Sequence, residues 1–179
     1  DGLCAPMIDV AQPDTHPILR NRCYGDDPTV VAELARAVAQ GTRDGGALPV
    51  VKHLPGHGRA RLDSHLDLPR TQATLADLER IDFPPVRALA HLSLAMTAHV
   101  VYATLDDRPA TQSPVIVQMM RDQLGVTGFL MTDDISMNAL KGSVAERGAA
   151  ALAAGCDAVL HCNGDLSEML SLADSIGVL

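Results

Sequence analysis

One polar segment, KHLPGHGRARLDSHLDLP over residues 52–69, collects more proton-active side chains than an ordinary surface loop needs. Lys52, His53, His57, Asp63 and His65 fall within fourteen positions of a chain that is 47% hydrophobic. Imidazole, carboxylate and ammonium groups at this density either bind a metal ion or transfer protons to and from a substrate. The spacing of these residues and the motifs elsewhere in the chain distinguish between a metal site and an acid–base site.

A metal site is poorly supported by the spacing of these residues. His53 and His57 are four positions apart, but Pro55 and Gly56 exclude the helix that would align them as two ligands. His57, Asp63 and His65 could still converge from a loop, with Asp133 as a further ligand. The chain contains no H-E-x-x-H and no C-x-x-C pattern. A metal-dependent hydrolase is therefore the alternative interpretation.

Acid–base chemistry fits the same loop better. In an extended segment, Asp63 and His65 would share a face, so the carboxylate could fix the imidazole tautomer and stabilise its protonated form. No G-x-S-x-G pattern supplies a serine nucleophile, but the run LMTDD places Asp133 at the end of an apolar segment. A carboxylate nucleophile with a separate proton donor is the arrangement of retaining glycoside hydrolysis.

The apolar runs of the chain predict the elements that position these groups. Five uninterrupted runs predict strands, at residues 3–10, 47–53, 94–102, 128–134 and 157–163. Helical patterns lie at residues 27–41, at 71–92 in two pieces broken at Pro84-Pro85, at 113–125, at 143–155, and from residue 165 onward. Strands that are apolar throughout must be covered on both faces, which indicates a parallel sheet wrapped by helices.

Polar residues gather at the carboxyl ends of these expected strands. They are Asp9, Lys52, His53, His99, Asp133, Asp134 and Asn163. A (β/α)8 barrel carries its chemistry at this rim, and no Gly-rich phosphate fingerprint favours an open doubly wound sheet. Only five strands are found, and a full barrel needs roughly 250 residues. We therefore expect residues 1–179 to form a single catalytic barrel domain of α/β class, an incomplete (β/α)8 barrel that begins at the third strand and lacks the first strands and the C-terminal tail.

Composition limits the partners. The formal net charge of −8 argues against nucleic acid or an anionic membrane surface. No apolar run is long enough to span a membrane. The four cysteines are scattered, with no C-x-x-C pair, which is typical of reduced thiols in a cytoplasmic protein.

Several motifs in one order resemble a known family. They are APMIDV, NRCYGDDP, KHLPGHG, DSHLDLP, MTAHVVY and FLMTDDISM. Together they resemble the β-N-acetylhexosaminidases of glycoside hydrolase family 3, cytoplasmic enzymes of bacterial cell-wall recycling. The resemblance covers essentially the whole chain, from the third barrel strand onward.

The resemblance implies a role for six residues. It assigns the nucleophile to Asp133, the acid/base to His65, the dyad partner to Asp63, and N-acetylglucosamine binding to Arg22, Lys52 and His53. The chain has Cys23-Tyr24 where the family usually has Ser-Phe, and Leu54 where it usually has Phe. These changes keep apolar bulk and leave the reacting groups untouched.

The implied activity is that of a retaining exo-β-N-acetylglucosaminidase without a metal or organic cofactor. Its substrate would be a peptidoglycan fragment with terminal N-acetylglucosamine linked to anhydro-muramic acid. The family has a sugar-binding aspartate and arginine on earlier strands, so the resemblance implies that missing strands or a neighbouring chain complete the fold. The remaining alternative is a catalytically silent fragment.

Two further expectations concern the other histidines and the loop. His57 is expected to shape the loop by hydrogen bonds, and His99 to be either a buried, hydrogen-bonded residue or a pocket residue. Glycines on both sides of His57 predict a mobile loop over residues 56–66 that can carry His65 in and out of the site.

Overall fold

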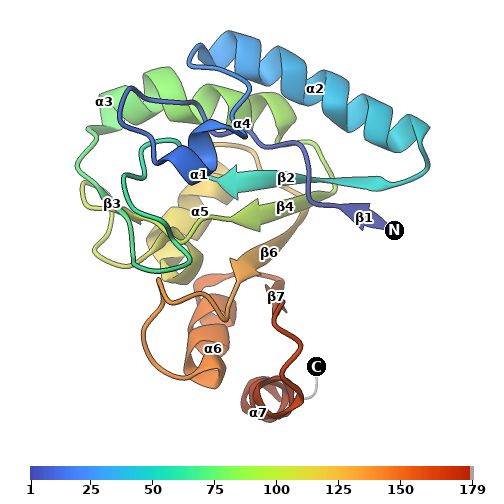
Figure 1. The fold of residues 1–179 in the computed structure, drawn as a ribbon, viewed down its shortest axis with the longest axis vertical. Coiled ribbons are helices and arrows are strands. Elements are labelled where there is room, and N and C mark those ends of the chain that lie inside the picture. The colour runs from blue at the N-terminus through green and yellow to red at the C-terminus, as the bar shows by residue number, and fades with distance from the viewer. Residues whose placement is uncertain (178–179) are drawn as a thin grey trace.

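A computed structural model describes residues 1–177 and contains a five-stranded, curled parallel sheet, drawn in Figure 1. The strand order is β1-β2-β4-β6-β7, and each neighbouring pair is parallel. These strands are β1 (Gly2–Leu3), β2 (Leu48–Leu54), β4 (Leu94–Thr97), β6 (Phe129–Asp134) and β7 (Ala158–Leu160). Strands β3 (Arg70–Thr71) and β5 (Val101–Tyr102) form a second, two-stranded parallel sheet. The expectation of an incomplete (β/α) barrel is confirmed.

Helices connect the strands of the main sheet, as parallel pairing requires. They are α1 (Pro17–Arg20), α2 (Pro28–Asp44), α3 (Leu75–Asp77), α4 (Phe83–Leu89), α5 (Pro114–Asp122), α6 (Val144–Ala154) and α7 (Leu166–Ile176), with a π-helical turn η1 (Leu78–Asp82) and a 3₁₀ turn η2 (Ala110–Gln112). Helix α2 packs on α4 and on β2, whereas α6 packs on α7 and on β7. Figure 1 accordingly shows two groups of helices, one beside each end of the strand order.

Capping residues in the sequence explain where most helices begin. The Asp27 side chain accepts the N–H groups of Thr29 and Val30 at the start of α2. Ser143 and Glu146 form the expected capping box at the start of α6, and Gly155 closes that helix in the left-handed region, at φ 108°. The helix starts predicted at Asp27, Ser113, Ser143 and Asp165 are therefore confirmed, whereas the helix predicted from residue 71 begins only at Leu75.

Three other predicted boundaries, of two strands and of one helix break, are wrong in detail. The run 94–102 is divided into β4 and β5, which belong to different sheets. Within the run 3–10, only β1 and an isolated bridge between Met7 and Lys52 pair with β2. Pro84 and Pro85 lie in the first turn of α4, where a missing N–H costs no helical hydrogen bond, so the break precedes them.

The core lies between the sheet and helices α2, α4 and α5. Aliphatic residues and methionines fill it, with the fully buried Phe83 and Tyr102 as its aromatic members. A smaller apolar cluster joins α6 and α7 around Leu140 and Leu172. Among residues 1–177, no helix combines the length and the apolar character needed to cross a membrane.

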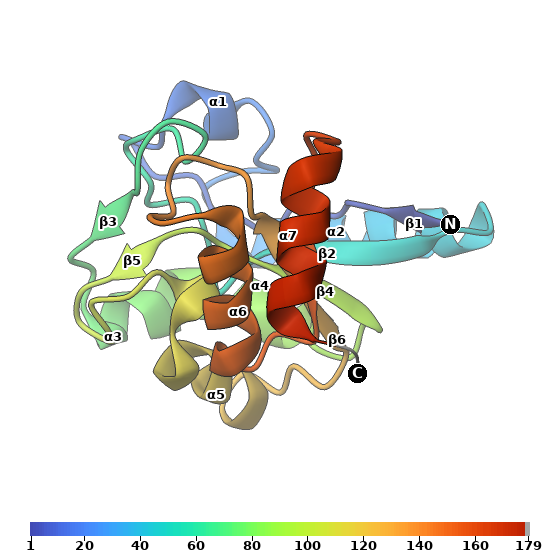
Figure 2. The same cartoon turned by 90° about the horizontal axis from the view of Figure 1, so that it is seen from below.

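The sheet brings the ends of distant segments together. Strands β2, β4 and β6 run in the same direction, so their carboxyl ends meet at one edge. Figures 1 and 2 show α1, β3 and β5 gathered at this end, with the N-terminus at the opposite end. The rim predicted to carry chemistry is therefore assembled from segments far apart in the sequence.

Candidate active site

All six residues singled out from the sequence line one small cavity at this rim. The cavity encloses about 130 Å³. Its lining comprises Arg22, Lys52, His53, Asp63, His65 and Asp133, together with Ile18, Leu19, His57 and Ser64. Lys52 and His53 come from the end of β2, Asp133 from the end of β6, and Asp63 and His65 from the loop between β2 and β3. The structure thus brings the predicted residues together, while their individual roles stay predictions.

Asp63 and His65 form the expected pair, but through a different backbone shape. His65 Nδ1 lies 2.7 Å from Asp63 Oδ1, and the same oxygen accepts the backbone N–H of His65 at 3.0 Å. The Asp63 carbonyl accepts the N–H groups of Leu66 and Asp67, so the segment is a turn rather than the extended chain predicted. The side chain of Asp63 holds this turn while orienting the imidazole.

The hydrogen bonds of the turn favour an ionised Asp63. The backbone N–H of His65 is the largest cause that lowers its pKa, and the imidazole of His65 adds to the effect. The side chain of His65 is 58% exposed, so its ring can reach a substrate at the mouth of the cavity. An imidazole held by an anionic carboxylate is suited to give and to accept a proton near neutral pH.

Asp133 is the buried anion of the site. Burial by itself would raise its pKa, but the neighbouring rings of His53 and His99 and the backbone N–H of Asp134 together outweigh that effect, so the pKa is lowered. Its Oδ1 accepts the backbone N–H of Asp134 at 2.8 Å, and its Oδ2 lies 3.8 Å from His53 Nε2. A carboxylate that stays ionised at the wall of a cavity can act as a nucleophile.

Asp9 is a fully buried member of the site to which the sequence assigned no role. Its Oδ2 lies 2.7 Å from His53 Nδ1, and its Oδ1 accepts the backbone N–H of His57 at 2.6 Å. The sequence placed Asp9 at the rim, as the acid that ends the run APMIDV. Its partners lie 44 and 48 positions away, so no local pattern could reveal the contact.

His57 and His99 are buried and serve the architecture. The ring of His57 lies 3.2 Å from Ser64 Oγ across the loop, and burial lowers its pKa to about 4, so it is neutral at physiological pH. His99 contacts the Thr111 hydroxyl at 2.8 Å and the Asp134 carbonyl at 3.0 Å. His57 therefore makes the hydrogen bond within the loop that the sequence predicted. His99 is a buried, hydrogen-bonded residue, the first of the two alternatives predicted for it.

The first half of the loop over residues 56–66 is held tightly. The Thr15 hydroxyl donates to the Gly58 carbonyl at 2.5 Å, and the Tyr102 hydroxyl donates to the Gly56 carbonyl. A Cβ on Gly58 would overlap the carbonyl of Val10, so only glycine allows this close approach. The anchored part ends near Ala60, which is buried, whereas Leu62 and Leu66 beyond it are exposed.

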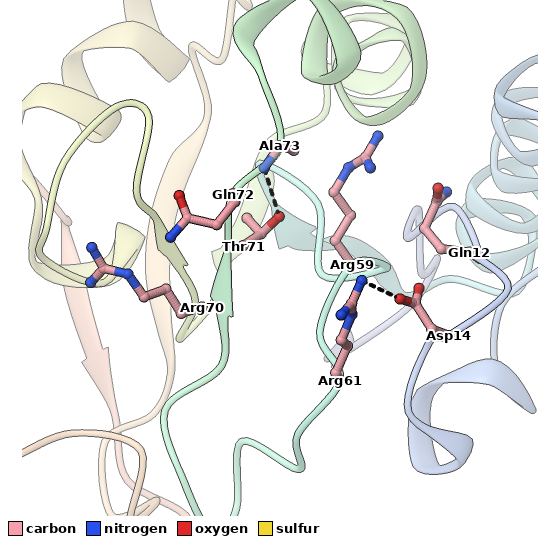
Figure 3. A pocket seen from close by; sticks show the side chains of 8 residues that line it. All are labelled: Gln12, Asp14, Arg59, Arg61, Arg70, Thr71, Gln72 and Ala73. Carbon is pink, nitrogen blue, oxygen red and sulfur yellow. Dashed lines mark hydrogen bonds and ion pairs between the residues drawn. The ribbon is translucent and has the colours of Figure 1, made fainter.

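A second, larger cavity of about 270 Å³ is also lined by residues of this loop, as Figure 3 shows. Its arginines already have anionic partners: Arg61 pairs with Asp14 at 2.5 Å, and Arg59 with the buried Asp82 at 2.7 Å. In Figure 3 the side chain of Arg70 points away from Arg61 and Asp14. None of the six predicted residues lines this cavity, so its greater volume does not identify it as the reaction site.

Potential metal ligands do not converge in the part of the chain that the structure describes. Across residues 1–177, no group of three or more His, Cys, Asp or Glu side chains has the arrangement to hold a metal ion. In particular, His57, Asp63, His65 and Asp133, the ligand set weighed above, do not form such a group. The lining residues instead form two pairs, Asp63 with His65 and Asp133 with His53.

Comparison with known proteins identifies close relatives. Residues 2–178 match the glycosyl hydrolase family 3 N terminal domain. Two curated relatives are named "Beta-hexosaminidase": one from Thiobacillus denitrificans, 40% identical over 164 residues, and one from Alkalilimnicola ehrlichii, 41% identical over 164 residues. Each match covers 89% of this chain, and covers 45% and 47% of the relative respectively. The chain thus spans about half the length of the curated relatives it matches.

Solved structures agree with this similarity. NagZ from Neisseria gonorrhoeae, in complex with N-trifluoroacetyl-D-glucosamine, superposes with a TM-score of 0.83 at 36% identity. That match covers 94% of this chain and 49% of the other. A family 3 β-N-acetylglucosaminidase from Paenibacillus sp. gives a TM-score of 0.87 at 30% identity, over 97% of this chain and 34% of the other.

Proposed function

Because the chain belongs to glycosyl hydrolase family 3, we propose that the protein is a retaining exo-β-N-acetylglucosaminidase. The observation that carries the proposal is the shared cavity of Asp133 and the Asp63–His65 pair. One wall offers an ionised carboxylate, and the other offers an imidazole oriented by a second carboxylate. These are the two groups that a double displacement at a glycosidic carbon requires.

The proposed reaction has two steps. Asp133 attacks the anomeric carbon and forms a glycosyl ester, while His65 protonates the departing oxygen. His65 then takes a proton from water, which attacks the same carbon and releases the sugar with its original anomeric configuration. An imidazole is neutral once it has given its proton, so it does not place a second anion beside Asp133.

The other lining residues fit a sugar with several hydroxyl groups. Arg22 and Lys52 bring cationic donors to the cavity, and His53 presents a ring nitrogen to it. We propose that these three bind the terminal N-acetylglucosamine. A solved family member holds N-trifluoroacetyl-D-glucosamine, which supports a pocket of this specificity.

The natural substrate in this proposal is a peptidoglycan fragment, N-acetylglucosamine linked to anhydro-muramic acid, cleaved in the cytoplasm during cell-wall recycling. The proposal includes a single barrel domain of which residues 1–179 form the third strand onward. Cell fractionation tests the location. Digestion of a purified muropeptide, followed by mass spectrometry, tests the substrate.

The decisive experiment uses a chromogenic N-acetylglucosaminide and the complete protein. Proton NMR early in the reaction should show the β-anomer of N-acetylglucosamine as the first product, before mutarotation forms the α-anomer. An initial α-anomer would exclude a retaining mechanism. Loss of activity on chelation, with stoichiometric metal in the purified protein, would favour the metal-dependent hydrolase. An active complete protein, together with folded but inactive residues 1–179, would favour the silent fragment.

A further inference from the structure

The buried carboxylate of Asp9 lies directly behind the histidine that faces Asp133. Asp9 has no exposed surface, and its three hydrogen bonds all come from the end of β2 and the loop that follows. They come from the backbone N–H groups of His53 and His57 and from the His53 ring. One carboxylate therefore fixes both the backbone and the side chain of His53.

The hydrogen bond between Asp9 and the His53 ring requires a proton on Nδ1. An ionised carboxylate can only accept, so the proton between Asp9 Oδ2 and His53 Nδ1, which are 2.7 Å apart, belongs to the histidine. The opposite nitrogen, Nε2, then faces Asp133 Oδ2 at 3.8 Å. The imidazole bridges two carboxylates that do not touch each other, one sealed from solvent and one at the cavity wall.

The charges around the two carboxylates agree with this arrangement. Burial by itself would raise the pKa of Asp9. His53 and His57 together lower it by more than burial raises it, so Asp9 stays ionised. The groups facing Asp9 are His53, His57, Cys23, Asp82 and Tyr102. Those facing Asp133 are His53, His57, His99, Cys162, Arg22, Lys52, Asp63 and His65. Of these groups, only the ring of His53 is in contact with the carboxylates of both Asp9 and Asp133.

We propose that Asp9 is a positioning residue that holds His53 between the two carboxylates with both ring nitrogens protonated, Nδ1 donating to Asp9 and Nε2 directed at Asp133, so that His53 keeps Asp133 anionic and ready to attack. This role rests on the proposed function, because it gives Asp133 the part of nucleophile. Asp9 touches neither the substrate nor the reacting atoms. It acts through the ring of His53, as the buried carboxylate of a catalytic triad acts through its histidine.

Asp9→Asn in the complete protein separates positioning from a merely structural role. The asparagine oxygen can still accept the N–H of His57, but its amide group would donate to His53 Nδ1, so that nitrogen gives up its proton and the ring becomes neutral. A neutral His53 lowers the pKa of Asp133 less than a cationic ring does. We expect the acidic limb of the kcat/KM–pH profile to move up by about one pH unit.

Asp157→Asn is the matched control. Asp157 also ties down a strand by accepting a backbone N–H, that of Leu130 at 2.7 Å, but it does so at the amino end of the sheet. It should leave the acidic limb in place. An unshifted limb in folded Asp9→Asn protein would overturn the proposal. If Asp9→Asn does not fold, His53→Gln is used, and an unshifted limb there overturns it equally.

A measurement without turnover keeps this inference distinct from the proposed function. Nitrogen-15 NMR of labelled histidines, with the His53 signals identified by their loss in His53→Gln, reports which ring nitrogen is protonated. We expect both ring nitrogens of His53 to be protonated in the wild type, and only Nε2 to be protonated in Asp9→Asn. A wild-type His53 without a proton on Nδ1 would refute the positioning role even in an active enzyme. An inactive wild type with the expected signals would refute only the proposed function.

Discussion

The imidazole of His65 is tied to Asp63 by a 2.7 Å contact between Nδ1 and Oδ1, yet its side chain is 58% exposed. The ring is therefore oriented on one side and open to an incoming substrate on the other. This relationship distinguishes His65 from His53, His57 and His99, which are all buried. Of these four histidines, it is the one placed to exchange a proton with a leaving group and with water.

His65→Ala tests this assignment through the leaving group. An activated aryl glycoside barely needs protonation of its leaving oxygen, whereas a natural disaccharide does. The variant should therefore lose about 10²-fold more kcat/KM on the disaccharide than on the aryl substrate. Parallel kinetics on both substrates measure the difference. His91→Ala, which changes an exposed histidine outside the cavity, serves as the control, and equal losses on both substrates in His65→Ala would argue against the acid/base role.

Asp133→Asn should abolish formation of the glycosyl-enzyme. Asparagine keeps the shape of the side chain but cannot form the ester, so kcat should fall by roughly 10³-fold or more. A 2-acetamido-2-deoxy-5-fluoro sugar should label Asp133 in the wild type, as read by mass spectrometry of peptides. Asp174→Asn makes the same chemical change on exposed α7 and should retain labelling. A label on Asp63 or Asp134 would contradict the assignment.

Local patterns in the sequence account for much of the fold. Asp27 and Ser143 marked helix starts correctly, because a cap acts on N–H groups two or three residues away. The apolar strands indicated a parallel sheet, and parallel pairing then placed Lys52 and Asp133 at one edge. Such predictions need only short-range rules and one rule of topology.

Long-range contacts explain what the sequence could not show. The contact of Asp9 is with His53, 44 positions away in the sequence. The local sequence of an acid at the end of a strand is the same with or without such a partner, so it could not predict this contact. The division of the run 94–102 follows from tertiary contacts as well: Val101 pairs with Arg70, whereas Ala95 pairs with β2 and β6. Pairing between segments, rather than residue preference, ended β4.

Hydrogen exchange should divide residues 53–68, the end of β2 and the loop that follows it, into two parts. The sequence predicted mobility over residues 56–66, but Gly56, Gly58 and Ala60 are held by bonds from Tyr102, Thr15 and His16. Amides of residues 53–60 should therefore exchange slowly, and those of 62–68 quickly. Peptide-resolved mass spectrometry provides the comparison, and Thr15→Val should speed exchange near Gly58. Uniformly fast exchange over 53–68 would show that these bonds do not anchor the loop.

Asp82 should give the protein a pH-dependent stability that its amide variant lacks. Burial raises the pKa of Asp82 from 3.8 to about 6, although Arg59 opposes the shift. The folded protein then binds more protons than the unfolded chain between these values, so this contribution is greatest below pH 3.8 and is lost as the pH rises through 6. His57, with a pKa lowered from 6.5 to about 4, has the opposite dependence.

The difference between wild type and Asp82→Asn isolates the contribution of Asp82. The stability of the wild type relative to the variant should be greater at pH 5 than at pH 7.5 by about 1 kcal/mol. Denaturant unfolding of the complete protein at both pH values measures it. His57 is present in both proteins and cancels. A difference that grows with rising pH would mean that the pKa of Asp82 is not raised.

Residues 1–179 expressed alone should not form a stable, active monomer. Strands β1 and β7 each have one neighbour in the five-stranded sheet, so each leaves backbone groups free to pair with other chains. Large apolar side chains are also exposed beside the edge strands and on α7: Leu3, Leu48, Phe129, Leu166 and Leu170. At about 25 cal/mol per Å², a few hundred Å² of uncovered apolar surface forfeits several kcal/mol, a large share of a typical stability of about 5–15 kcal/mol. We expect aggregation on size-exclusion chromatography, a non-cooperative thermal melt and no turnover of an aryl N-acetylglucosaminide, whereas the complete protein should be monodisperse and active. A monomer of residues 1–179 that melts cooperatively and has full activity would show that this half-barrel is sufficient.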